Sequence, residues 1–147
     1  MTSETLFTPA RSHSLRMLSN LRLVALLVIA LTVVGVTGCR TSPIRNLDNQ
    51  PIPPGATMAE VSKAIQASGN SLGWAMQEVG PGLIFGTLQL RDHTAKVEIP
   101  FSTRDYSIRY KSSTNLKYNA SKKTIHSNYN SWVINLDNQI RARLASI

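Results

Sequence analysis

The chain has 147 residues and carries 16 Lys and Arg against 8 Asp and Glu, a net charge of +8. This length suits one modest domain and is too short for two ordinary ones. The single cysteine excludes an intramolecular disulfide, so a covalent framework cannot supply the stability of the fold.

The N-terminal segment has the three parts of a secretory signal peptide. Arginines precede an apolar run over residues 23–34, and small residues follow it. The run falls short of the roughly 20 apolar residues that a membrane-spanning helix needs. We therefore expect residues 1–38 to be a signal peptide that is removed. Met17 is an alternative start, because it would give a signal peptide of more ordinary length.

The sequence Val36-Thr37-Gly38-Cys39 closely resembles a lipobox, the processing site of bacterial lipoproteins. The resemblance implies a diacylglycerol thioether on Cys39, cleavage before that cysteine, and N-acylation of the new amino terminus; no other cofactor is expected. Two or three acyl chains anchor a protein stably, since each buried CH2 contributes about 0.8 kcal/mol. Arg40 follows the cysteine, and by analogy with enterobacterial sorting this favours the outer membrane, facing the periplasm. The alternative is an uncleaved anchor helix with an incidental cysteine.

Residues 39–56 are expected to form a lipidated tether ahead of a single domain over residues 57–147. The segment contains Pro43, Pro51, Pro53, Pro54 and Gly55. Proline at this density favours extended, semi-rigid chain and excludes helix. We therefore expect this segment to hold the domain away from the lipid surface.

The domain is expected to open with a short helix and to continue as strands. Thr57-Met58-Ala59-Glu60 has the form of a capping box, and Gly69 is a natural end for the helix. The apolar period then changes to two over residues 72–77, 83–91, 94–102 and 106–111. The connections are too short for crossovers, so the four strands should form an antiparallel meander.

The last segment is expected to be a long helix. Apolar residues recur at spacings of three and four from Ile125 to Leu144. The sequence therefore predicts an α+β two-layer sandwich with a short N-terminal helix, a four-stranded antiparallel meander and a long C-terminal helix packed on one face. Both helices should lie on that face, and Trp74 and Trp132 should lie in the core.

The residues that usually carry catalysis do not occur in a recognisable arrangement. His93 and His126 are the histidines beyond the signal peptide, and the sequence has no H-x-x-x-H pair. The carboxylates are scattered singly. We expect no catalytic residues and no metal site, and a hydrolase built on either histidine is disfavoured. Export also disfavours a nucleic-acid partner.

Polar residues gather before and at the start of the last helix. The pattern consists of Arg91-x-His93, Tyr106-x-Ile108-x-Tyr110, Ser113-x-Asn115-Leu116-x-Tyr118 and Ile125-His126-x-Asn128-Tyr129-Asn130-x-Trp132-Val133. Together with the lipobox, it resembles an uncharacterised family of small proteobacterial lipoproteins, over roughly residues 57–145. The resemblance implies export and this fold, and it assigns no substrate.

Two interpretations of these polar residues are open. Asn and His side chains can cap free backbone N–H groups or hold the preceding loop by hydrogen bonds. Alternatively, a polar pocket binds a sugar or a peptide. The residues expected to form this pocket are Arg91, His93, Asn115, Tyr118, His126 and Asn130.

The expected function is that of a non-catalytic interaction or assembly module, anchored by lipid on the periplasmic side and meeting an envelope protein partner. The alternative is a module that binds an anionic envelope component, namely lipopolysaccharide, acidic lipid or peptidoglycan. From residue 40 onward, 13 Lys and Arg face 7 Asp and Glu. Lys96, Arg109 and Lys111 fall on the outer register of their strands, and a basic sheet face of this kind attracts anions.

Overall fold

The structure is a computed structural model that describes residues 40–147. Several predictions fall outside this range, namely the signal peptide over residues 1–38, the alternative start at Met17, and the predicted lipobox of Val36, Thr37, Gly38 and Cys39. Within residues 40–147, no helix has both the length and the hydropathy needed to cross a membrane.

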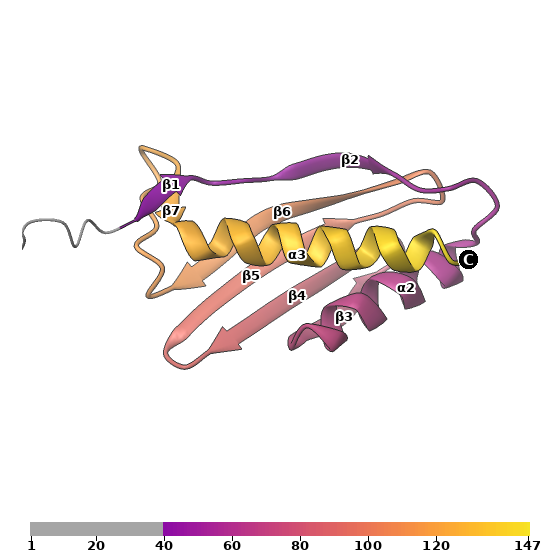
Figure 1. Cartoon of the computed structure of the whole chain (residues 1–147), viewed down its shortest axis with the longest axis horizontal. Helices are drawn as coiled ribbons and strands as arrows, with labels where there is room; N and C mark the ends of the chain where they lie inside the picture. Colours follow the sequence, from indigo (N-terminus) through magenta and orange to yellow (C-terminus); the bar gives the residue numbers. More distant parts are fainter. Residues whose placement is uncertain (1–39) are drawn as a thin grey trace, which may run out of the picture. The chain divides into compact units, whose positions relative to one another are not determined.

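The described chain is an α+β fold, as expected. Its elements are, in chain order, β1 (Thr41–Pro43), β2 (Leu47–Pro51), α2 (Met58–Ser71), β3 (Trp74–Gly80), β4 (Leu83–Leu90), β5 (His93–Pro100), β6 (Asp105–Thr114), β7 (Thr124–His126) and α3 (Ser127–Leu144) (Figure 1). The main sheet is antiparallel with the order β2-β6-β5-β4-β3, and β1 and β7 form a separate antiparallel pair.

Helix α2 begins where the capping box predicts. The Thr57 side chain accepts a hydrogen bond from the Glu60 N–H, and the Glu60 carboxylate accepts one from the Thr57 N–H at 2.8 Å. The helix does not end at Gly69, which is buried inside it. A Cβ built at Gly69 would overlap the side chain of Met76 on β3, so this glycine allows close packing of helix and strand.

The meander β3–β6 forms the centre of the sheet. Its inward register carries the buried core side chains Trp74, Ile84, Leu88, Ala95, Val97, Ile99, Tyr106 and Ile108. This alternation is the one that the sequence predicts for strands with a single buried face. Trp74 is buried as expected, whereas Trp132 is only partly buried and packs against the edge of the core.

The residues before α2 correct the expectation of a four-stranded sheet that follows a free tether. Strand β2 pairs with β6 and makes the sheet five-stranded. Strand β1 pairs with β7, with Thr41 opposite His126 and Pro43 opposite Thr124. Prolines fit here because edge strands leave N–H groups without a ladder partner, so a missing donor costs little. Much of the expected tether is therefore part of the folded domain.

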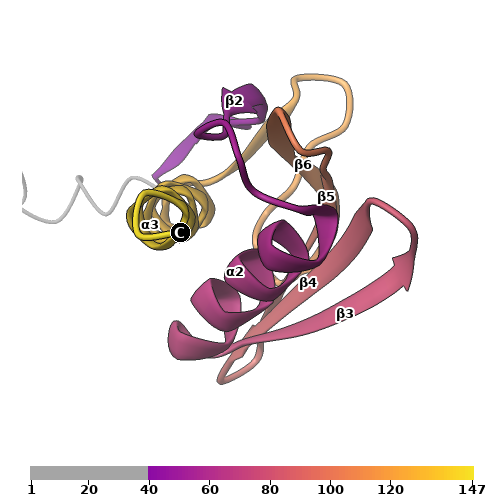
Figure 2. The same cartoon turned by 90° about the vertical axis from the view of Figure 1, so that its right-hand side faces the viewer.

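Both helices lie on the same side of the main sheet (Figure 2). Helix α3 starts at Ser127 rather than at Ile125, because Ile125 belongs to β7. Its buried positions include Tyr129, Val133, Leu136, Ile140 and Leu144. These side chains and the inward register of the strands enclose one hydrophobic core within residues 40–147.

Candidate functional site

The residues expected to form a polar pocket occupy separate places in the fold. Arg91 and His93 flank the β4–β5 turn, where Arg91 has a φ of 55°. The His93 ring nitrogen Nδ1 lies 3.0 Å from the backbone carbonyl oxygen of Asn115, and the Asn115 amide donates to the carbonyl of Asp92 at 2.8 Å. These contacts join the turn to the end of β6, so they bring together two of the six residues, His93 and Asn115.

His126 and Asn130 make structural hydrogen bonds at the start of α3. His126 Nδ1 accepts from the backbone N–H of Asn128 at 3.3 Å and thereby caps the helix. Asn130 donates to the Ser42 hydroxyl and to the Pro43 carbonyl, both at 2.9 Å, and accepts from the Arg45 N–H at 3.0 Å. These contacts are the capping and loop-holding roles that the sequence left open for them.

Tyr118 lies in the loop between β6 and β7, two residues after Leu116, whose backbone carbonyl accepts a hydrogen bond from the His126 N–H at 2.8 Å. Its ring stacks on Tyr110 with the centroids 4.6 Å apart, and Tyr110 meets the buried Tyr129 edge-on at 5.6 Å. Burial raises the pKa of the Tyr129 hydroxyl well above its ordinary value. The geometry therefore gives Tyr118 a packing contact with Tyr110.

The outer face of the sheet is less basic than its sequence suggests. Arg109 Nε lies 2.6 Å from the Asp48 carboxylate of β2, and Arg109 stands opposite Glu98 in the strand register. Lys111 Nζ lies 4.1 Å from the centroid of the Phe85 ring. Of the three expected cations, Arg109 is therefore balanced by a neighbouring carboxylate.

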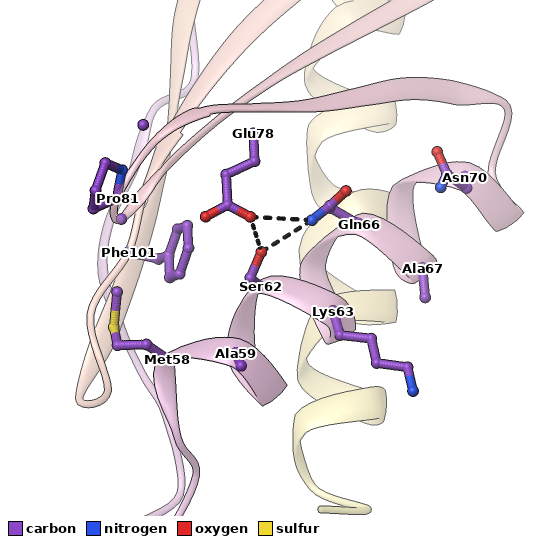
Figure 3. Close-up of a pocket in the computed structure, with 12 residues that line it drawn as sticks. Met58, Ala59, Ser62, Lys63, Gln66, Ala67, Asn70, Glu78, Pro81 and Phe101 are labelled. Carbon is purple, nitrogen blue, oxygen red and sulfur yellow. Dashed lines mark hydrogen bonds between the residues drawn. The ribbon is translucent and has the colours of Figure 1, made fainter.

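A large open groove lies between α2 and the hairpin that joins β3 to β4. We call it the α2–β3 groove; it measures about 970 Å³. Its apolar lining includes Met58, Ala59, Ala67, Pro81 and Phe101 (Figure 3). Met58 is the first residue of α2, and 39% of its surface is exposed here.

A hydrogen-bonded polar group lies inside the α2–β3 groove. The Ser62 hydroxyl donates to Glu78 Oε2 at 2.5 Å, and Gln66 Nε2 lies 2.9 Å from the Ser62 oxygen and 3.4 Å from the same carboxylate oxygen. In Figure 3, Glu78 lies between Phe101 and Gln66, whereas the Lys63 ammonium points away from it. No ion pair of Glu78 occurs within residues 40–147.

The α2–β3 groove follows an open edge of the sheet. Strand β3 is the last in the order β2-β6-β5-β4-β3, so β4 alone pairs with it among the residues that the structure describes. The groove-lining residues of α2 run from Met58 to Asn70, which is about 18 Å of helix at 1.5 Å per residue. An unpaired strand edge beside an apolar groove offers both backbone partners and side-chain pockets to an extended chain.

The expectations from sequence did not include this groove, although one signal for it was present. The inward register of β3 carries Trp74 and Met76 and then Glu78, a carboxylate at a position where the pattern demands an apolar residue. Ser62 and Gln66 likewise interrupt the helix at a spacing of four, on one side of α2. Polar residues at matching inward positions of two neighbouring elements indicate a site.

Within the part of the chain that the structure describes, no group of three or more His, Cys, Asp or Glu side chains could hold a metal ion. In comparisons with protein-family models, with curated proteins and with solved structures, the chain matches none. The resemblance to small proteobacterial lipoproteins thus stays a prediction.

Proposed function

We propose that the chain is a lipid-anchored envelope lipoprotein that acts as a non-catalytic interaction module on the periplasmic side of the outer membrane. Its partner is a protein segment that binds in the α2–β3 groove. The observation that carries the proposal is the position of this groove along the unpaired edge of β3. The lipobox ending at Cys39 supports the anchor.

An extended segment is the occupant that fits this geometry. A chain that lies beside β3 continues the antiparallel sheet through backbone hydrogen bonds, and its alternate side chains reach the groove. Met58 and Phe101 offer apolar contact to those side chains. Backbone hydrogen bonds between the partner segment and β3 supply affinity, and the side chains that line the groove select the sequence of the partner segment.

Glu78 supplies the selectivity for charge. Its carboxylate accepts hydrogen bonds from Ser62 and Gln66 and has no cation beside it among the described residues. A Lys or Arg side chain of the partner would complete the set of partners of this carboxylate, and Arg can do so with two parallel hydrogen bonds. The partner segment should therefore alternate apolar residues with at least one basic residue.

The test is photo-cross-linking with the full chain in its native host. A photoreactive amino acid replaces Ala59 or Ala67 in the groove, and Ala142 on the exposed side of α3 serves as the matched control position. Groove positions should give an adduct that Ala142 does not give. Sequencing of the cross-linked peptide should show an apolar segment with a Lys or Arg.

Glu78→Lys should reduce the yield of this adduct by about tenfold, the effect of a loss of about 1.4 kcal/mol in binding free energy. Glu98→Lys, which changes a carboxylate on the opposite face of the sheet, should leave the yield unchanged. The proposal would be contradicted by an adduct yield that Glu78→Lys leaves unchanged, by an adduct between two copies of this chain, or by equal cross-linking at Ala142.

The anchor is tested separately. Metabolic labelling with an alkyne analogue of palmitate should mark the wild-type protein and should not mark the Cys39→Ser variant. Labelling of the variant, or release of the wild-type protein from membranes by salt alone, would show that acylation of this cysteine does not hold the chain.

A further inference from the structure

Positive charge gathers at the end of the fold where β1 pairs with β7. We call this the basic end; its exposed cations are Arg40, Arg45, Lys117, Lys122 and Lys123. Backbone hydrogen bonds hold the two contributing segments together, because the Ser127 N–H donates to the Arg40 carbonyl at 2.9 Å and the Ile44 N–H donates to the Lys123 carbonyl at 2.8 Å.

The basic end contains few opposing charges. Residues 40–47 and 106–136, which contribute all of its cations, include no Asp or Glu. The neighbouring β4–β5 turn adds Arg91 and Asp92, whose charges cancel, and the Asp92 carboxylate lies 3.5 Å from His93. The cations therefore produce a positive potential over this end of the molecule.

The basic end is also the place where the chain enters the fold. Thr41 is the first residue of β1, so Arg40 alone separates the sheet from residue 39. One residue spans at most about 3.6 Å. An acyl group on Cys39 would thus hold this end of the domain, and no other, against the lipid surface.

We infer that the basic end docks on anionic lipid headgroups and fixes the orientation of the domain on the membrane. This inference rests on the lipid anchor of the proposed function. Headgroup phosphates are attracted by Lys and Arg within a Debye length of the surface, and an acyl anchor combined with a basic patch binds more strongly than either alone.

The orientation has a direct effect on the α2–β3 groove. Helix α3 begins beside β7 and runs for 18 residues, about 27 Å, to the other end of the domain (Figure 1). There its last residues share a cavity with Glu60 at the start of α2. Docking by the basic end therefore points the start of α2, and the adjoining groove, away from the bilayer.

The experiment uses the full-length protein, purified from membranes in detergent and reconstituted into vesicles. One set of vesicles is phosphatidylcholine, and the other contains equal parts of phosphatidylcholine and phosphatidylglycerol. An amine-reactive acetylating reagent is applied, and mass spectrometry follows each lysine. In the anionic vesicles, acetylation of Lys122 and Lys123 should fall about fivefold, which corresponds to the contribution of one surface cation. High salt should restore it.

Lys63 and Lys96 are the internal controls, because they lie on α2 and on the outer face of β5. Their acetylation should be equal in both kinds of vesicle. The double variant Lys122→Glu, Lys123→Glu should abolish the lipid dependence at Lys117, whereas Lys96→Glu should preserve it.

Three results would overturn the inference while leaving the anchor intact. These are equal labelling of Lys122 and Lys123 in both vesicles, protection of Lys63 or Lys96 instead, and protection that persists in detergent without lipid. If the protein fails to float with either kind of vesicle, the anchor itself is wrong, and the orientation falls with it.

Discussion

The hydroxyl of Tyr106 on β6 donates a hydrogen bond to Asp137 Oδ1 on α3 at 2.7 Å. Asp137 is buried, and its other carboxylate oxygen lies 2.6 Å from Arg141 one helical turn later. Arg141 in turn donates to Gln50 of β2 at 2.6 Å. One polar chain thus connects the sheet, the long helix and the strand that was expected to be tether.

Replacing Asp137 with Ala should lower the free energy of unfolding by about 3 kcal/mol, because it removes the carboxylate acceptor of the buried Tyr106 hydroxyl and the ion-pair partner of Arg141. Asp48→Ala is the matched control, since its pair with Arg109 is exposed and should contribute less than about 1 kcal/mol. Urea unfolding of both variants measures the difference. Equal losses would contradict this assignment.

Tyr129 offers the opposite case, because its buried hydroxyl has no hydrogen-bond partner within residues 40–147. Tyr129→Phe removes this unsatisfied group and retains the ring, so it should raise the free energy of unfolding by about 1 kcal/mol. Tyr106→Phe should lower it by a similar amount, because that hydroxyl is paired. The two Tyr-to-Phe variants should therefore differ in the sign of the shift in urea midpoint.

Alkaline pH should destabilise the fold through the same two tyrosines. Burial is the main cause that raises the pKa of Tyr106 and of Tyr129 above the ordinary value near 10. The folded state keeps these protons when the unfolded state has lost them, so the stabilisation is complete below about pH 10 and is lost as pH rises further.

Each tyrosine adds a slope of up to about 1.4 kcal/mol per pH unit in this range. Urea unfolding at pH 8 and at about pH 11 should show this loss, and Tyr129→Phe should roughly halve the tyrosine contribution to the slope. An unchanged slope in that variant would contradict the role of burial.

Asn130 holds β1 in place, so Asn130→Ala should release that strand selectively. Three hydrogen bonds to residues 42, 43 and 45 are lost. We expect amide hydrogen exchange at Ile44 and Ser127 to quicken at least about tenfold, with a loss of roughly 1–2 kcal/mol in the free energy of unfolding. Asn138→Ala, on the exposed side of α3, is the control and should change neither.

Gly69→Ala tests a conflict between helix propensity and packing. Propensity alone predicts that Ala within α2 stabilises by about 1 kcal/mol. The new methyl would instead overlap Met76, so we expect a net destabilisation. The double variant Gly69→Ala, Met76→Ala removes the overlap, so Gly69→Ala should destabilise the Met76→Ala protein less than it destabilises the wild type. Thermal unfolding of the wild type, the two single variants and the double variant measures both effects.

Local patterns in the sequence were sufficient for the elements whose partners are close in the chain. The capping box at Thr57 and the alternation from Trp74 to Tyr110 predict α2 and the meander, because each depends on neighbours a few residues away. The start of α3 was missed by two residues because Ile125 continues the apolar period of the helix while it pairs in β7.

The strands before α2 were not predictable in the same way. Leu47 pairs with Ile108, and Thr41 pairs with His126. Because these partners are far apart in the sequence, no local pattern of apolar residues predicts their pairing. Prolines at the ends of β1 and β2 suggested a tether, although edge strands tolerate them. The contacts of the six residues predicted to form a polar pocket were not predictable for a related reason, because residues that are close in a motif can face different neighbours once β6, β7 and α3 diverge.

The short β1–β7 pair also has a mechanical consequence. A pull applied at residue 40 would open this pair from its end, one hydrogen bond after another, before it loads the five-stranded sheet. Release of residues 40–46 would detach a segment whose extended length is about 23 Å at 3.3 Å per residue. The first strand can thus detach from the edge of the domain under load while the five-stranded sheet and its core stay intact.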